Sequence, residues 1–469
     1  MIFQGLSPSF WGSLADVWGR RPVYLSTLLV YMGSCIGLAL SPKYYVLLIL
    51  RMLQAFGSSS VIAIGAGVVG DIATPAERGG YFGLFSMGQM LGPVIGPVLG
   101  GIISQYLSWR WIFWILLIIG AAFFTAILFL LPETLRSLVG NGGGYANPTP
   151  SQWLRRKRRA QKEKVIDEKH QQQQQQEMVY NSERDDDSST IHGGDEEHDG
   201  DAQHHRVAVD NSRQQLPLQT SKNRFLQIPN VTQPFLYLLE KDIFCALIYN
   251  AIHYATYYCY LTSTTSQFIL LYKMNQIQIG LCFLCQGVGC IIGSFVTGKI
   301  LDRDFRVVAK QSCHANVTRG KLPVDFPIFK ARLRSMWIVA AAIQIITLFY
   351  GWMLQIHAHL AVALVLQFIV GFSNTSMFNI FQTLAVDLFP GKSATITASN
   401  NLVRCLLGAV ASVSIEPGIK GVGVGWCFTI IGLICVASNA LVPVLFKYGP
   451  RWRKERIERL ARRAKQQVQ

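Results

Sequence analysis

The sequence predicts an all-α, polytopic membrane protein, and three observations lead to this prediction. Half of its 469 residues are apolar, only 15% are charged, and the mean hydropathy is +0.28, which is too apolar for a soluble domain of this length. Apolar runs of membrane-crossing length recur along the chain. A charged cluster between two such runs occurs once in each half of the chain, which indicates a duplicated architecture whose two halves rock against each other.

Each predicted span is long enough to cross the bilayer as a helix, which takes about 20 residues for roughly 30 Å of hydrocarbon. The opening run 1–15 is too short, so we interpret it as the end of a helix whose beginning, with everything before it, is absent. Ten full spans are expected to follow, at 22–40, 45–71, 80–104, 111–131, 243–271, 277–301, 334–355, 359–386, 393–415 and 421–446.

The positive charge of the chain indicates its orientation in the membrane. The formal net charge is +16, but the basic residues lie in short loops and tails between apolar runs, so the positive-inside rule explains them better than nucleic-acid binding does. We expect the cytosolic face to carry the first charged cluster, Arg78, the loops 133–242 and 302–334, Lys392 and the tail after Lys447. The opposite face then carries only Lys43, Arg110, Lys273 and Lys420.

Metal, cofactor and enzyme chemistry are not indicated. Of the ten cysteines, all except Cys313 lie in apolar runs, where thiols behave as small hydrophobic groups. We interpret the pair Cys282 and Cys285 as helix packing. The histidines of the loop have no ligand spacing, and there is no GxxxxGK[ST] phosphate loop. We therefore expect no enzyme activity, no cofactor and no metal site.

The first charged cluster, GSLADVWGRRP, sits at the mouth of a membrane-length apolar run. Its carboxylate and two guanidiniums, Asp16, Arg20 and Arg21, can form ion pairs that act as a conformational latch. Gly12 and Gly19 allow the backbone to approach closely where the chain turns.

The second charged cluster, GKILDRDFR, begins at Gly298 and repeats this arrangement. We expect Asp302 and Arg303 to form the matching latch. Because both clusters fall on the predicted cytosolic side, the two latches would hold that side closed.

A second polar feature lies in the span 45–71, where Arg51, Gln54 and Gly57 are three residues apart and share one helix face. A guanidinium facing lipid is costly, so Arg51 should face protein or water. We assign Gln54 to the substrate cavity. The alternative for Arg51 is an anchor for helix packing or for the membrane interface.

The next span is rich in glycine at steps of four, interleaved with proline. Such a groove lets a neighbouring helix approach closely, and proline removes backbone hydrogen bonds and bends the helix. The residues of this motif are Gly88, Gly92, Pro93, Gly96, Pro97, Gly100 and Gly101.

The first span of the second half carries Asn250, His253, Tyr254 and Tyr257 at helical spacing, so they share one face. Polar groups in a membrane turn inward, and we expect this face to line the cavity. Its aromatic rings suit flat organic cations. His253 is a candidate proton carrier because imidazole titrates near neutral pH; a structural histidine is the alternative.

Later spans add further candidates for the cavity. Asn374 and Asn379 supply neutral polar surface in the span 359–386, which repeats the pattern of the Arg51 helix without its arginine. Arg404, in the next span, should face inward. It would bind an anionic group or pair with a buried carboxylate, but no acid lies nearby in the sequence.

These motifs resemble those of the major facilitator superfamily. Gly12 to Arg21 resembles its signature loop, LILRMLQAFG resembles a motif of proton-coupled members, and GQMLGPVIGPVLGG resembles the antiporter motif of exporters. PETLRSLVGNG resembles the corresponding stretch of fungal twelve-spanner drug:proton antiporters, most closely the quinidine and multidrug resistance subgroup with its polyamine and dityrosine exporters.

The resemblance implies two pseudo-symmetric six-helix bundles. The N-terminal bundle would comprise residues 1–138, from a partial second helix to the sixth, and the C-terminal bundle residues 241–446. We interpret 139–240, which has few apolar residues, as a disordered cytosolic loop. The basic tail 447–469 is expected to lie as a helix on the anionic inner leaflet.

The function implied is proton-coupled antiport by alternating access, exporting drugs or other small amphipathic, cationic compounds. Arg51 is then implied to influence a proton-carrying group. The partners would be a small-molecule substrate, protons and the lipid bilayer of the plasma or vacuolar membrane, without nucleic acid. The alternatives are a solute uptake carrier of the same superfamily and a truncated, non-transporting paralogue.

Overall fold

The structure, a computed structural model, describes residues 1–140, 146–162, 164–166, 232–312, 323 and 325–466. The chain divides into two units: unit 1 comprises Met1–Asn147 and Arg224–Gln469, and unit 2 comprises Pro148–Asn223. Most of the predicted central loop, 167–231, lies outside the described residues.

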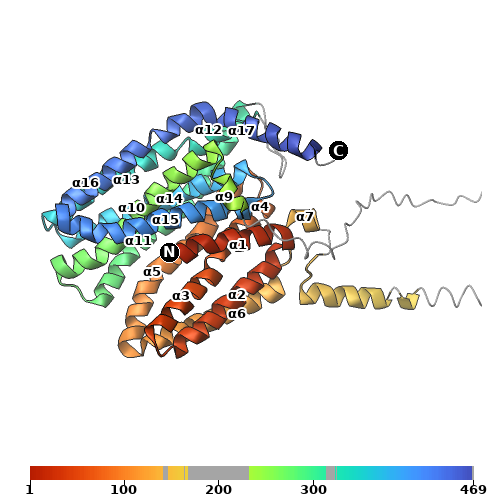
Figure 1. The fold of residues 1–469 in the computed structure, drawn as a ribbon, viewed down its shortest axis with the longest axis horizontal. Helices are drawn as coiled ribbons and strands as arrows, with labels where there is room; N and C mark the ends of the chain where they lie inside the picture. The colour runs from red at the N-terminus through yellow and green to blue at the C-terminus, as the bar shows by residue number, and fades with distance from the viewer. Residues whose placement is uncertain (141–145, 163, 167–231, 313–322, 324, 467–469) are drawn as a thin grey trace, which may run out of the picture. The chain divides into compact units, whose positions relative to one another are not determined.

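Unit 1 is helical, and the described residues contain no strand, which confirms the all-α prediction (Figure 1). Its first-half helices are α1 (Ile2–Trp18), α2 (Arg20–Leu40), α3 (Tyr44–Ser58), α4 (Ser60–Ile72), α5 (Arg78–Tyr106), α6 (Trp109–Leu130) and the short α7 (Arg136–Val139). Its second-half helices are α9 (Gln233–Tyr237), α10 (Lys241–Tyr272), α11 (Gln276–Gln311), α12 (Ile328–Leu333), α13 (Met336–Gln355), α14 (Leu360–Leu388), α15 (Ser393–Val422), α16 (Val424–Ser438) and α17 (Leu441–Gln466).

Eight helical segments among the described residues are long and apolar enough to cross a membrane. They match eight of the ten predicted spans, and the other two predictions coincide with α5 and α10, which are 29 and 32 residues long. The eight are Arg20–Leu40, Tyr44–Ile72, Trp109–Leu130, Ile277–Gln311, Met336–Gln355, Leu360–Leu388, Ser393–Val422 and Val424–Leu460. The polytopic fold is therefore confirmed.

The most extensive contacts between the halves of unit 1 are those of α1 with α15 and of α5 with α11, and α4 with α15 and α5 with α14 add smaller ones. Small residues make the two most extensive contacts possible. A Cβ at Gly12 would lie 3.1 Å from the Ala394 carbonyl oxygen, and one at Gly83 would lie 2.7 Å from that of Ser294. The close approach predicted at Gly12 is therefore present.

The glycine stripe of α5 does not serve the helix packing predicted for it. A Cβ at Gly88, Gly92, Gly96 or Gly100 would meet no atom of another described element within 4 Å. Gly83, five residues before Gly88, makes the contact with α11 instead. Five residues rotate a helix by about 140°, so the stripe points away from α11. The motif helix itself runs unbroken through Pro93 and Pro97.

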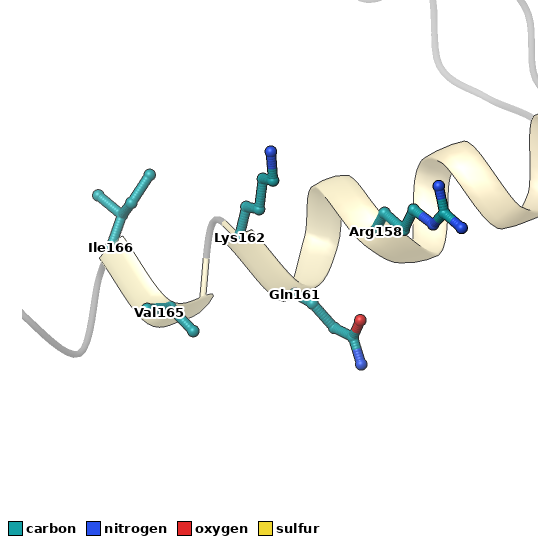
Figure 2. Close-up of a pocket in the computed structure, with 5 residues that line it drawn as sticks. All are labelled: Arg158, Gln161, Lys162, Val165 and Ile166. Atoms are coloured by element: carbon teal, nitrogen blue, oxygen red, sulfur yellow. The ribbon is translucent and has the colours of Figure 1, made fainter.

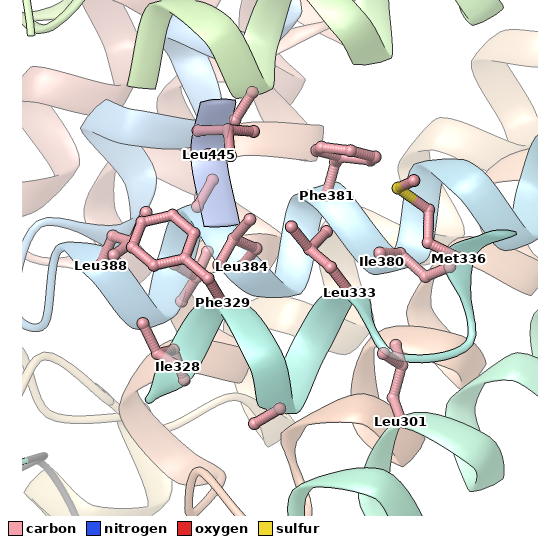
Figure 3. Packing of buried hydrophobic residues seen from close by; sticks show 14 of the residues in the cluster. Leu301, Ile328, Phe329, Leu333, Met336, Ile380, Phe381, Leu384, Leu388 and Leu445 are labelled. Carbon is pink, nitrogen blue, oxygen red and sulfur yellow. The ribbon is translucent and has the colours of Figure 1, made fainter. Parts of the chain in front are cut away.

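The short helix α12 is fixed by apolar contacts with three longer helices. Figure 3 shows Phe329 and Leu333 of α12 packed with Leu384 of α14 and Leu445 of α17. Leu333 is fully buried. This packing holds Arg332, the residue next to it, in the interior of unit 1.

Unit 2 contains a helix over 150–162 that the sequence analysis did not predict. It begins at a reciprocal cap: the Gln152 amide donates to Thr149 Oγ1 (3.2 Å), and the Thr149 amide donates to Gln152 Oε1 (3.0 Å). Thus the predicted disordered loop is helical at this place, and most of the basic run 155–164 lies on that helix.

A shallow hollow lies on the same segment of unit 2, shown in Figure 2. The side chains around it come from successive turns of a single segment, so it offers a ligand one wall only. They are Arg158, Gln161, Lys162, Val165 and Ile166.

Candidate functional site

Buried and half-buried charges gather at one end of unit 1, where α1, α4 and α14 end, α2, α5 and α15 begin, and the last turns of α11 lie. We call it the charged end. Two groups lie there: the N-terminal clamp, which is Asp16, Arg20 and Asp71, and the C-terminal clamp, which is Asp302, Arg332 and Asp387.

In the N-terminal clamp one arginine lies between two carboxylates. Arg20 is fully buried. Its Nη1 lies 2.6 Å from Asp16 Oδ1, and its Nε lies 2.9 Å from Asp71 Oδ2. The predicted pairing of Asp16 with Arg20 is present. The partner supplied by α4, Asp71, was not predicted.

Arg21 does not pair with Asp16, contrary to the prediction. Its Nη1 donates to the Asn147 carbonyl at 3.0 Å, and its Nη2 donates to the Leu128 carbonyl at 2.7 Å. Consecutive residues of a helix point in different directions, so Arg20 and Arg21 cannot both face Asp16. The turn between α1 and α2 requires Gly19, whose φ is 112°.

Asp16 also reaches across to the second half. Its Oδ2 accepts hydrogen bonds from the backbone amide (3.0 Å) and the hydroxyl of Thr395, in the first turn of α15. The first amides of a helix have no partner within the helix, and a negative charge is favourable there. A side chain of α1 therefore caps a helix of the other half.

Asp302, in the last three turns of α11, makes the equivalent contact in the opposite direction. Its two carboxylate oxygens accept from the amides of Gly79 and Gly80, each at 2.8 Å, in the first turn of α5. Arg303 is exposed and does not form the predicted pair with Asp302, because neighbouring residues of a helix face different sides.

Asp387 connects the C-terminal clamp to the first half. Arg332 Nε lies 2.7 Å from Asp387 Oδ2, and Arg78 of α5 pairs with the other oxygen. Arg332 also donates to the Pro75 carbonyl at 2.5 Å. Neither ion pair of Asp387 was predicted from the sequence.

The basic tail is a continuation of the last span, because α17 runs unbroken from Leu441 to Gln466. Arg456 is buried and places its Nη1 2.6 Å from both oxygens of Asp242, while Arg453 donates to the Phe326 carbonyl at 3.0 Å. The first part of the tail thus binds the charged end. Ile457 and Leu460 are exposed, and their contact with lipid stays a prediction.

The predicted polar face around Arg51 is present. Arg51 donates to Gln54 Oε1 at 3.2 Å and lies 4.8 Å from the centroid of the Phe113 ring. Gln54 is buried and donates to Cys35 Sγ at 3.2 Å. Arg51 itself is exposed, and its role in proton coupling stays a prediction.

The predicted cavity face of α10 is buried in this conformation. Asn250, His253, Tyr254 and Tyr257 are each 8% exposed or less. His253 Nδ1 lies 3.0 Å from the Tyr249 carbonyl oxygen, and its Nε2 has no hydrogen-bond partner among the described residues.

A chain of amide side chains crosses the second half beside this face. Asn250 donates to Asn400 at 2.9 Å, Asn400 donates to Gln382 at 2.7 Å, and Gln382 donates to Thr397 at 2.6 Å. These hydrogen bonds link α10, α15 and α14, and a shift of any of these helices would break them.

Two predicted cavity residues of α14 differ in their partners. Asn379 donates to Ser294 Oγ at 3.1 Å, and Ser294 donates in turn to the Gly83 carbonyl of α5 at 2.5 Å. Asn374 is 3% exposed, and its Nδ2 has no partner within the described part of the chain.

Arg404 faces the interior of the second half, as predicted. It is 2% exposed, and its guanidinium carbon lies 4.4 Å from the ring centroids of both Tyr254 and Phe378. Nη2 donates to Asn401 Oδ1 at 2.9 Å. Nε and Nη1 have no hydrogen-bond partner among the described residues.

Comparison with known proteins gives consistent results for sequence and fold. The family model for the Major Facilitator Superfamily matches residues 1–412. Citrate exporter 1 of Aspergillus niger is 36% identical over 470 residues, covering 99% of this chain and 80% of that protein. The MFS antiporter QDR2 of Candida albicans is 31% identical over 452 residues, covering 95% and 79%.

Two solved structures share the fold. The proton:xylose symporter XylE matches with a TM-score of 0.59 and 12% identity, over 95% of this chain and 84% of that one. The human organic anion transporter MFSD10 matches with a TM-score of 0.56 and 16% identity, over 94% and 81%. At these identities the similarity concerns the fold alone.

Proposed function

The chain belongs to the major facilitator superfamily and is a multi-pass membrane transporter, and we propose that it exports small organic compounds in exchange for protons by alternating access. Export is supported by the glycine and proline motif of α5 and by the similarity to a citrate exporter and to an antiporter. The proposed direction places the charged end in the cytosol, as the distribution of basic residues predicts.

The closed charged end is the observation that carries this proposal. Asp16 caps α15, Asp302 caps α5, and the pair of Arg78 with Asp387 joins the halves directly. Opening toward the cytosol requires all three contacts to break. A hydrogen bond to a charged group contributes about 1.5–3 kcal/mol, so the three contacts together hold this state closed until substrate or proton binding offsets them.

Proton coupling requires a titratable group whose surroundings change between the two states. We propose His253 for this role, with Arg51 influencing the proton-carrying group. His253 is 1% exposed and has one ring nitrogen without a partner among the described residues. A proton on that nitrogen would create a buried charge, which favours a state in which water reaches the ring.

Transport by the full chain in inside-out vesicles tests this function. An acidic interior should drive accumulation of citrate or of a cationic dye such as rhodamine 6G, and a protonophore should abolish it. Citrate and the dye represent the two opposite charges that the relatives' names suggest. Accumulation that is insensitive to the pH gradient would contradict antiport, and movement only in the opposite direction would indicate an uptake carrier.

A further inference from the structure

Arg404 is a buried cation without a counter-charge. Four other buried arginines, Arg20, Arg78, Arg332 and Arg456, each form an ion pair with an aspartate. No ion pair of Arg404 is found within the described residues, and its Nε and Nη1 have no acceptor there. A guanidinium stays protonated in proteins, and burying it unpaired costs several kcal/mol.

The position of Arg404 in the membrane is deep. It lies about three turns, or roughly 16 Å, along α15 from Ser393 at the charged end. The apolar layer is roughly 30 Å thick, so this depth places the guanidinium near its middle. Superfamily folds of this kind bind their substrates at that level, between the two repeats.

The carboxylates on the helices around Arg404 are too far away to neutralise it. On α14, Asp387 lies two and a half turns from Phe378, or about 13 Å, and it already binds two arginines. On α10, Asp242 lies more than three turns from Tyr254, or about 18 Å, and it binds Arg456. On α15 itself, Glu416 lies more than three turns from Arg404, or about 18 Å, in the direction away from Ser393.

The aromatic rings beside Arg404 are occupied by its own guanidinium. Tyr254 and Phe378, from α10 and α14, each lie 4.4 Å from it. Cation–π contact contributes about 2 kcal/mol when desolvated, which is less than the burial of an unpaired charge costs. The ring faces that contact Arg404 are therefore not open to a cationic substrate, and the fixed positive charge repels one.

We propose that Arg404 binds a carboxylate of the exported compound, so that the substrate is an organic anion rather than an organic cation. This rests on the proposed transport function and names its substrate class. Nε–H and Nη1–H are donors in the plane of the guanidinium, where a carboxylate binds best.

Two further donors lie on neighbouring turns. Asn374 is one turn from Phe378 on the same face of α14, with a free Nδ2 among the described contacts. Tyr258 accepts from the Tyr254 hydroxyl at 3.2 Å and keeps its own hydroxyl hydrogen. An anion with more than one polar group would find these donors one turn away from the two rings that contact the arginine.

Equilibrium binding to the purified full chain tests the proposal without any proton gradient, so a failure of antiport would not affect the result. The probes are tricarballylate, its trimethyl ester and tetraphenylphosphonium, and the readout is the thermal midpoint as a function of probe concentration, since a ligand that binds the folded state raises it. Tricarballylate should stabilise the protein more than sodium chloride of equal ionic strength, whereas the neutral ester and the cation should not.

Substitutions test whether Arg404 is the residue that binds tricarballylate. Arg404→Gln should weaken tricarballylate binding at least tenfold, and Arg404→Lys should weaken it less, because the charge remains while the planar donor arrangement is lost. Arg451→Gln, which removes an arginine that is exposed in the tail, is the matched control and should bind as the unmodified chain does.

Three results would overturn the proposal. They are stabilisation by tetraphenylphosphonium in preference to tricarballylate, equal stabilisation by tricarballylate and its ester, and unchanged affinity in Arg404→Gln. If Arg404→Gln does not fold, the comparison of acid with ester on the unmodified chain and the affinity of Arg404→Lys still decide.

Discussion

The two clamps share one contact and differ in another. In both, an aspartate in the last three turns of a long helix caps the first turn of a helix in the opposite half: Asp16 caps α15, and Asp302 caps α5. In the N-terminal clamp the ion pairs stay within one half. In the C-terminal clamp Asp387 binds an arginine from each half.

This difference shows which part of the duplicated architecture is symmetric. The capping aspartate depends only on the crossing of two helices, so it recurs in both halves. The cation is supplied differently: Arg20 lies four residues after Asp16, whereas Arg332 comes from the separate helix α12. Asp387 is therefore the point at which the ionic attraction between the halves is concentrated.

Replacing Asp387 should have the largest effect. Asp387→Asn leaves Arg78 and Arg332 buried without their counter-charge, and removal of one partner from a buried ion pair costs about 3–5 kcal/mol. We expect a loss of thermal stability in detergent of that order and near-complete loss of transport. Glu455→Gln, which breaks the exposed pair with Arg451, is the control and should change stability by less than about 1 kcal/mol.

Asp16→Asn should have the second-largest effect. It removes the charge from the cap of α15 and one of the two carboxylates of Arg20, while Asp71 still neutralises that arginine. We expect an open charged end to become populated. The measurement is the rate of maleimide labelling of Ser393→Cys, a position that is 2% exposed, in a chain whose native cysteines have been replaced; unchanged labelling would contradict the capping role.

Arg78→Gln and Arg332→Gln separate the two functions of the C-terminal clamp. Arg78 belongs to the other half, and Arg332 still neutralises Asp387 when Arg78 is lost, so Arg78→Gln should speed labelling of Ser393→Cys and lower stability less than Asp387→Asn does. Arg332 is fully buried, and of its hydrogen bonds one reaches the first half, at the Pro75 carbonyl, so its loss should lower the thermal midpoint more than Arg78→Gln does. Equal effects of the two variants on both measurements would show that the clamp does not distinguish the halves.

Alanine substitutions along α5 should have the smallest effects and opposite signs. Gly83→Ala would place a methyl group 2.7 Å from a backbone oxygen of α11 and should destabilise the protein. Gly92→Ala meets no atom of another described element and should stabilise it by up to about 1 kcal/mol through helix propensity. Thermal unfolding in detergent measures both, and a stability loss in Gly92→Ala would mean that the stripe is packed.

The sequence predicted the features that depend on residues close together in the chain. Spans follow from local composition, and the pair of Asp16 with Arg20 follows from a spacing of four residues on neighbouring turns. Asp387 pairs with Arg332 and with Arg78 across 55 and 309 positions, and no local pattern contains those contacts. Which face of α5 meets α11 is likewise decided by tertiary packing, so the glycine pattern indicated close approach at the wrong residues.

Arg404 illustrates a different kind of limit. Its inward orientation could be predicted, because a guanidinium avoids lipid. The choice between a buried carboxylate and an anionic ligand could not, since it depends on how far the acids of three helices lie from it. The aromatic face of α10, which suggested cations, proved to be in contact with this arginine.

The separation of the halves at the charged end tests the central claim most directly. Spin labels at Glu77→Cys and Arg303→Cys report that separation by double electron–electron resonance. The two positions are exposed and lie on opposite sides of the contact between α5 and α11. The account predicts one short distance between the labels in the protein that keeps Asp387, and an additional, longer distance in the protein that also carries Asp387→Asn. The same single short distance in both proteins would contradict it.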